Sequence, residues 1–102
     1  FNITNQAAFE LDKLVAIMEK YPEMIIRAES HTDSRGPAAY NKLLSERRAK
    51  ATAQYVISKG INENRISGVG KGEEEPEIDC ASGCTKDKHA KNRRSEFIVV
   101  TN

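Results

Sequence analysis

The stretch that decides the fold is MIIRAESHTDSRGPAAYNKLLSERRAKATAQYVISKG, residues 24–60. It begins with Met24–Glu29, a short β-branched segment whose partial alternation predicts a strand. The polar, Gly- and Pro-containing segment Ser30–Pro37 predicts a loop. Ala38–Lys59 then contains neither Pro nor Gly and keeps its apolar residues on roughly one face, while Gly60 stands where a left-handed helix cap is expected. The stretch therefore predicts a strand, a loop and a long helix.

Upstream of this stretch the sequence predicts another helix, from about Asn5 to Lys20. Pro22 ends it, because the residue before a proline is pushed out of the helical region. The apolar residues that recur at helical spacing are Leu11, Leu14, Val15 and Met18.

Downstream, Arg65–Gly70 predicts a short strand of small residues, and Lys71–Asn92 a long polar connection with a helical turn at Thr85–Lys91. Ser95–Thr101 predicts a closing strand. Its apolar residues are expected to bury both faces of that strand: Phe97, Ile98, Val99 and Val100. These elements together predict an α/β (α+β) fold, a two-layer sandwich with helices packed on one face of a small mixed sheet.

Length and composition limit the possible functions. A chain of 102 residues is sufficient for one domain, residues 1–102. Its 16 basic and 15 acidic residues leave a net charge of +1, which counts against a dedicated nucleic-acid binder. No segment approaches the roughly 20 apolar residues of a membrane-spanning helix. Because Phe1 is not an initiator methionine, we expect a fragment of a longer protein.

Two charged residues are candidates for a binding site. Asp33 follows a predicted strand and precedes a helix, where it either forms a local Asx-turn or contacts a ligand. Arg48 shares a helix face with Asn41 and Leu44, where its guanidinium is either solvated or held in place for a functional role. The residue types alone leave both alternatives open.

Several motifs in order are similar to those of the OmpA-like peptidoglycan-binding domain (the OmpA/Pal/MotB family). The first is His31-Thr32-Asp33-Ser34-Arg35-Gly36, followed by Tyr40-Asn41 and by Leu44-Ser45-Glu46-Arg47-Arg48-Ala49. Further on come Gly60-Ile61, Arg65-Ile66, Gly70-Lys71-Gly72-Glu73, Pro76 and Asn92-Arg93-Arg94-Ser95-Glu96-Phe97. The resemblance extends from about Ile3 to Val100 and is specific because the motifs occur together at near-family spacing.

This resemblance implies a non-catalytic periplasmic domain of a Gram-negative outer membrane protein or lipoprotein. Such a domain binds peptidoglycan non-covalently and tethers the outer membrane to the cell wall. The family's ligand contacts fall here on Asp33 and Arg48, which would hold the ammonium and the carboxylate of meso-diaminopimelate in the stem peptide. Asn41 and Arg93 match supporting positions, and Thr32 and Arg35 flank the loop. No cofactor or metal is expected, and the rest of the protein would supply any membrane contact.

The sequence departs from the family pattern at three places. Ser30 stands where the family usually has Gly, and the first strand of the family's βαβαβ-type fold is expected upstream of Phe1. The third departure is an insertion, Asp79–Cys84, which resembles those of Bacteroidetes-type members. The alternatives are a cell-wall anchor in a motor or secretion complex, then an enzyme acting on the wall, then a nucleic-acid module.

Two cysteines, Cys80 and Cys84, lie within the insertion. In an oxidising periplasm we expect them to form a disulfide, with a small effect on stability because the loop is short. A zinc site that adds His89, and His31 as a further ligand, is less favoured because the spacing is not a standard ligand pattern.

Overall fold

The computed structural model describes residues 3–78, 80 and 83–101. Each predicted helix and strand is present, with bounds that differ from the prediction by at most two residues. The elements, in chain order, are α1 (Asn5–Lys20), β1 (Ile25–His31), α2 (Ala38–Ser58), the 3-10 turn η1 (Glu63–Arg65), β2 (Ile66–Gly72), α3 (Lys86–Asn92) and β3 (Arg94–Thr101). No helix among the described residues is long and apolar enough to cross a membrane.

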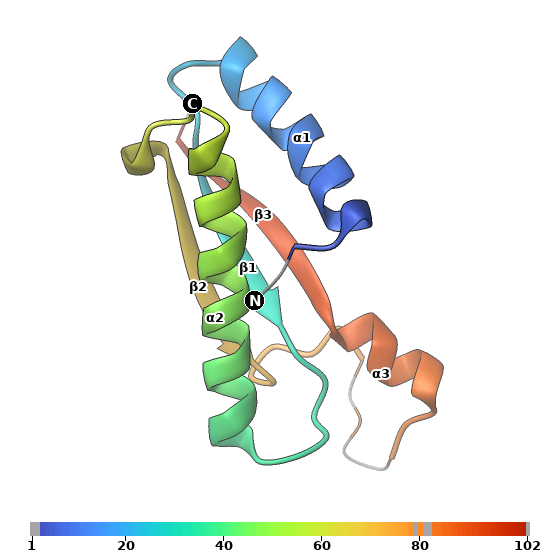
Figure 1. Ribbon diagram of the computed structural model, residues 1–102. Coiled ribbons are helices and arrows are strands. Elements are labelled where there is room, and N and C mark those ends of the chain that lie inside the picture. Colours follow the sequence, from blue (N-terminus) through green and yellow to red (C-terminus); the bar gives the residue numbers. More distant parts are fainter. Residues whose placement is uncertain (1–2, 79, 81–82, 102) are drawn as a thin grey trace.

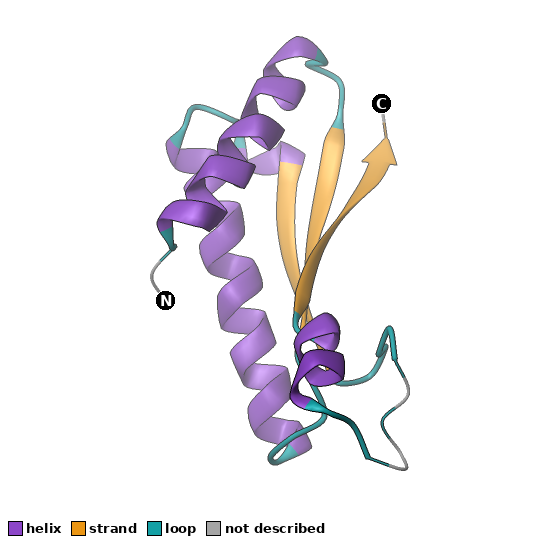
Figure 2. Ribbon diagram, turned by 90° about the vertical axis from the view of Figure 1, so that its right-hand side faces the viewer, coloured by secondary structure: helices purple, strands orange, loops and turns teal. Residues whose placement is uncertain are grey.

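The strands form one mixed sheet in the order β2-β1-β3 (Figure 1). β1 pairs with β2 in parallel, and α2 provides the crossover that a parallel pair requires. β3 returns antiparallel to β1 and forms the other edge of the described sheet. Both long helices, α1 and α2, lie on one side of the sheet (Figure 2), which confirms the predicted two-layer architecture.

Helix α2 lies directly on β2, and two glycines allow this approach. A Cβ atom at Gly68 would lie 2.4 Å from the carbonyl oxygen of Ala49, and one at Gly70 would lie 2.2 Å from the backbone nitrogen of Glu46. Both distances are far below van der Waals contact with backbone atoms, which cannot move aside cheaply. The small residues of the predicted second strand therefore let the helix pack close to the sheet.

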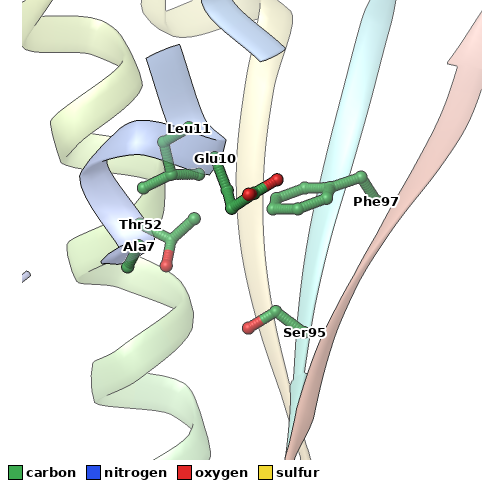
Figure 3. A pocket seen from close by; sticks show the side chains of 6 residues that line it. All are labelled: Ala7, Glu10, Leu11, Thr52, Ser95 and Phe97. Atoms are coloured by element: carbon green, nitrogen blue, oxygen red, sulfur yellow. The ribbon is translucent and has the colours of Figure 1, made fainter. Parts of the chain in front are cut away.

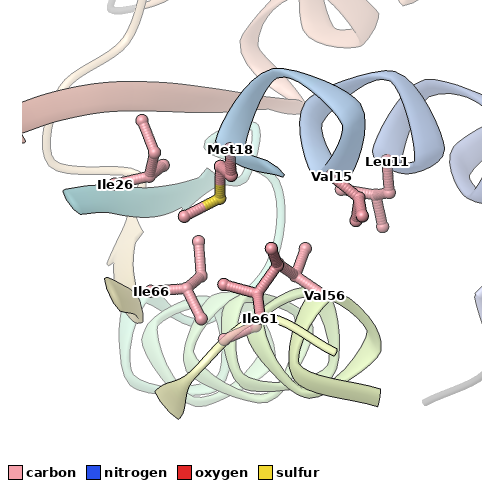
Figure 4. Close-up of a cluster of buried hydrophobic side chains, with 8 residues drawn as sticks. Leu11, Val15, Met18, Ile26, Val56, Ile61 and Ile66 are labelled. Atoms are coloured by element: carbon pink, nitrogen blue, oxygen red, sulfur yellow. The ribbon is translucent and has the colours of Figure 1, made fainter. Parts of the chain in front are cut away.

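The hydrophobic core lies between the two long helices and the first two strands (Figure 4). Helix α1 begins at Thr4, whose hydroxyl accepts a hydrogen bond from the Ala7 N–H at 3.1 Å. Arg65 fastens the end of α1, since its guanidinium donates to the carbonyl oxygens of Met18 and Tyr21. The buried core residues are Leu11, Val15, Met18, Ile26, Ala53, Val56, Ile61 and Ile66.

The prediction that β3 buries both faces is wrong. Phe97, Val99 and Val100 are 39%, 50% and 54% exposed, and Ile98 is partly buried. As an edge strand, β3 has a neighbour on one side only, and α2 covers β2 at the opposite edge of the sheet. On its helix side β3 is not fully covered, and a hollow lined in part by Phe97 remains open between α1 and β3 (Figure 3).

The connection from β2 to α3 is fastened at two points. The predicted Cys80–Cys84 disulfide is present, with the Cα atoms 5.2 Å apart. Asn92, only 1% exposed, accepts from the Ile78 N–H at 2.8 Å and donates to the Ile78 carbonyl at 2.9 Å. Three residues of the predicted insertion, Asp79, Ala81 and Ser82, lie outside the described residues. Because both thiols form the disulfide, neither is free to bind zinc as a thiolate.

Candidate functional site

Asp33 is a buried carboxylate just beyond the end of the central strand, 7% exposed. Its Oδ1 accepts a hydrogen bond from the Arg35 backbone N–H at 3.0 Å, which is the predicted Asx-turn. Its Oδ2 accepts from two guanidinium groups, Arg35 Nη2 at 2.9 Å and Arg93 Nη1 at 2.7 Å. The loop and the segment before β3 therefore meet at this one carboxylate.

These contacts keep Asp33 ionised. The hydrogen bond from the Arg35 side chain, followed by that from Arg93, holds the pKa of the Asp33 carboxyl well below its ordinary value of 3.8, against the opposing effect of burial. The pKa of the Arg35 guanidinium is raised in turn by Asp33. At neutral pH the site therefore contains a fixed negative charge between two positive ones.

Asn41 holds the Asp33 loop against the first turn of α2. Its side chain is 5% exposed, and its amide nitrogen donates to the carbonyl oxygens of Arg35 at 2.9 Å and of Asp33 at 3.3 Å. These bonds fix the backbone on both sides of the turn. In this structure Asn41 is thus a positioning residue for the loop.

Thr32 leaves a polar atom available beside Asp33. Its backbone N–H donates to the Gly72 carbonyl at 2.9 Å, which extends the pairing of β1 with β2. Its hydroxyl oxygen is buried and has no hydrogen-bond partner among the described residues. A buried hydroxyl without a partner is uncommon, because it loses its hydrogen bonds to water.

Arg48 is exposed on α2 and makes no ion pair within the part of the chain that the structure describes. Its side chain lines a hollow between α1, α2 and β3, together with Ile3, Thr4, Ala7, Ala51, Thr52 and Ser95. A second hollow shares Ala7, Thr52 and Ser95 with the first and continues toward Phe97 (Figure 3). The two hollows are therefore adjacent and lie on the helix side of the sheet.

Of the residues predicted for the site, Asp33, Arg35, Arg93 and Asn41 form one connected cluster with Thr32 beside it. Arg48 is not bonded to this cluster, so the predicted pair does not form a direct contact. Ser95 connects the two regions, because it lines the hollow of Arg48 and pairs with Ser30, three residues before Asp33.

Sequence reasoning missed two residues that hold this region together. Ser45, which is completely buried, accepts from the Gly72 N–H at 2.8 Å and donates to the Lys42 carbonyl at 2.8 Å. Asn92 fastens the long connection beside Arg93. A serine and an asparagine on otherwise polar segments give no periodic signal, so only their positions within the motifs point to them.

The fold and the charged loop define an α+β domain that presents a buried, paired carboxylate at the end of its central strand. A comparison with known families matches residues 1–93 to the OmpA family. The chain belongs to this family, which is non-enzymatic.

Two relatives illustrate the sequence similarity. The chain is 40% identical over 90 residues to outer membrane porin F of Pseudomonas fluorescens, covering 88% of this chain and 27% of that protein. It is 48% identical over 75 residues to outer membrane protein A of Bordetella avium, covering 74% of this chain and 37% of that protein. The chain thus spans less than two fifths of either relative. Homology of this kind places it among periplasmic domains of Gram-negative outer membrane proteins and lipoproteins.

A solved structure confirms the fold. The peptidoglycan-associated lipoprotein of Burkholderia pseudomallei superposes with a TM-score of 0.83 at 26% identity, covering 94% of this chain and 79% of that one. The predicted α+β class and its mixed sheet are therefore those of OmpA-like domains.

Proposed function

We propose that this chain is a single domain, residues 1–102, which binds peptidoglycan non-covalently through the meso-diaminopimelate of the stem peptide and anchors an outer membrane to the cell wall. The observation that carries the proposal is the ionised Asp33 carboxylate, held in place at the end of β1. Family membership and the similarity to the peptidoglycan-associated lipoprotein of Burkholderia pseudomallei support the choice of peptidoglycan.

Diaminopimelate carries an ammonium and a carboxylate on its side-chain stereocentre, so its recognition needs one anion and one cation. Asp33 accepts three hydrogen bonds in this structure. An ionised carboxylate offers about four acceptor sites, which leaves one for the ligand ammonium. Arg35 is 52% exposed at its side chain, so it can move into solvent if the ligand ammonium replaces its positive charge beside the carboxylate.

Arg48 supplies the cation in this proposal. It follows Asn41 by seven residues, which places both on one face of α2, about 10.5 Å apart along the helix axis. Side chains on a helix lean toward its N-terminus, so a rotamer of Arg48 directed toward the loop that Asn41 holds is compatible with the helix. In the structure Arg48 lines the hollow between α1, α2 and β3, and the proposal requires its guanidinium to turn from there toward the ligand. Its planar fork can bind the ligand carboxylate through two parallel hydrogen bonds.

The remaining site residues support this pair. Arg93 orients Asp33 and adds positive charge for the ligand carboxylate, while Asn41 holds the loop. Thr32 offers its hydroxyl group to the ligand as a further hydrogen-bonding group, and the Arg35 side chain bonds back to Asp33 across the turn. We also propose, from the insertion alone, that the chain is a Bacteroidetes-type member of the family.

The test is retention by purified sacculi. Asp33→Asn keeps the shape of the side chain and removes its charge, so we expect retention to fall by at least about tenfold. Glu19→Gln, which removes an exposed charge from α1, is the matched control and should bind as the unmodified chain does. Full retention of a folded Asp33→Asn variant would refute the ammonium contact.

A further inference from the structure

The sheet face away from the long helices carries a buried charged cluster that the proposed function does not use. Along β1, Ile26 belongs to the core beneath the helices and Ala28 shares its face of the strand, so Glu29 and His31 lie on the opposite face. The antiparallel register places Glu96 of β3 directly across from Glu29. Glu29 and His31 are only 7% and 3% exposed.

Neither ring nitrogen of His31 has a hydrogen-bond partner within the described part of the chain, although both are buried. Its Nε2 points between two carboxylates, 3.6 Å from Glu29 Oε1 and 3.8 Å from Glu96 Oε2. Both distances exceed a hydrogen bond. A buried imidazole without a hydrogen-bond partner is uncommon, and one aimed at two carboxylate oxygens is suited to share a cation with them.

Two arginines orient the carboxylates from outside. Arg27 donates to Glu29 Oε2 at 2.8 Å, which leaves Oε1 directed toward His31. Arg94, across from His31 on β3, donates to Glu96 Oε2, the same oxygen that faces His31, and Oε1 of that carboxylate has no partner among the described residues. A metal would therefore share Oε2 with Arg94 or take Oε1 after the carboxyl group turns. An outer hydrogen bond such as that of Arg27 is typical of metal ligands, whose orientation it fixes.

We propose that Glu29, His31 and Glu96 form a binding site for Zn²⁺. One imidazole nitrogen and two carboxylate oxygens are a common ligand set for this ion. The three ligand atoms lie within 4.8 Å of one another. With metal–ligand bonds of about 2.0–2.1 Å, tetrahedral geometry separates ligands by about 3.3 Å. This is a few tenths of an ångström below the distances of 3.6 and 3.8 Å from His31 Nε2 to the two carboxylates.

Water completes the fourth position. The site is separate from Asp33, which follows His31 by two residues and takes its partners from Arg35 and Arg93. Arg27 and Arg94 already donate hydrogen bonds to the two carboxylates and would compete with the metal for them. We therefore expect an affinity for Zn²⁺ in the micromolar range. The imidazole favours Zn²⁺ over Mg²⁺, which prefers oxygen ligands and retains its water.

Isothermal titration of the tag-free, disulfide-bonded chain with zinc chloride tests this proposal. We expect one saturable site for Zn²⁺ and no signal with magnesium chloride at the same concentration. Glu96→Gln should weaken zinc binding by at least about tenfold, and because its side chain is 42% exposed the variant should fold. His31→Gln should abolish binding.

His89→Gln is the matched control, since it removes the chain's other histidine, which lies outside the cluster. It should bind zinc as the unmodified chain does. Replacing Zn²⁺ with Co²⁺ adds a readout independent of heat, because cobalt bound to this set shows visible absorption that Glu96→Gln should remove. Absence of a saturable zinc site, or equal affinity in a folded Glu96→Gln variant, would overturn the proposal.

Discussion

Arg93 Nη1 lies 2.7 Å from Asp33 Oδ2, and this ion pair joins residues that are 60 positions apart in the sequence. It fastens the start of the last strand to the loop that follows the central strand. The Asp33 side chain is 9% exposed and that of Arg93 is 39% exposed, so water screens the pair in part. A single carboxylate thus holds a candidate recognition loop and contributes to stability.

The first prediction concerns the pH dependence of this contribution. Because the pKa of Asp33 is lower in the folded chain than its ordinary value of 3.8, the stabilisation is complete above that value and is lost as pH falls. Between about pH 6 and pH 2, the unmodified chain should lose about 2 kcal/mol more unfolding free energy than Asp33→Asn. Urea denaturation followed by circular dichroism measures this difference; parallel pH profiles would contradict it.

Contact between α2 and β2 gives the second prediction. In Gly70→Ala the new Cβ would lie 2.2 Å from the Glu46 backbone nitrogen, so the helix must shift away from the sheet. We expect a loss of about 3 kcal/mol or more in unfolding free energy. Ser67→Ala, an exposed position on the same strand, serves as the control and should change stability little. A thermal unfolding comparison of the two variants is sufficient.

The elements of the fold are predictable from the sequence because their signals are local. Helix α1 has apolar residues at helical spacing between Thr4 and Pro22, and α2 has a long interval without Pro or Gly. Exposure of Phe97 and Val99 could not be predicted, because it depends on which strand stands at the edge of the sheet. An alternating apolar strand has the same pattern at the edge and in the centre.

The candidate site was predictable only in part. The resemblance to a family identified Asp33, Asn41 and Arg93, and the structure brings these three into contact. It named Arg35 only as a residue that flanks the loop, and the bonds of Arg35 to Asp33 were not predicted because they depend on the geometry of the turn. Nor could it place Glu96 beside Glu29, since that requires the register of β1 against β3.

The third prediction compares the two fastenings of the β2–α3 connection. The Cys80–Cys84 loop is short, so replacing both cysteines with serine should cost at most about 2 kcal/mol. Asn92→Ala should cost more, about 2–3 kcal/mol, because both Ile78 backbone groups would lose their partner. Urea denaturation of both variants gives the order; a larger loss for the cysteine variant would contradict the prediction.

The last prediction separates charge from geometry at Arg48. This side chain is exposed and has no ion pair among the described residues, so Arg48→Ala should leave thermal stability nearly unchanged. Retention by sacculi should nevertheless fall at least about tenfold, and Arg48→Lys should restore little of it because an ammonium cannot bind a carboxylate through a planar fork. Arg47→Ala removes the same charge one position away, where the helix turns it to a different face, and should bind normally.

Walls built with lysine in place of diaminopimelate lack the carboxylate that Arg48 would bind, so on them the unmodified chain and Arg48→Ala should be retained equally weakly. If Arg48→Ala still reduced binding to those walls, its role would be general attraction to an anionic polymer rather than recognition of the stereocentre.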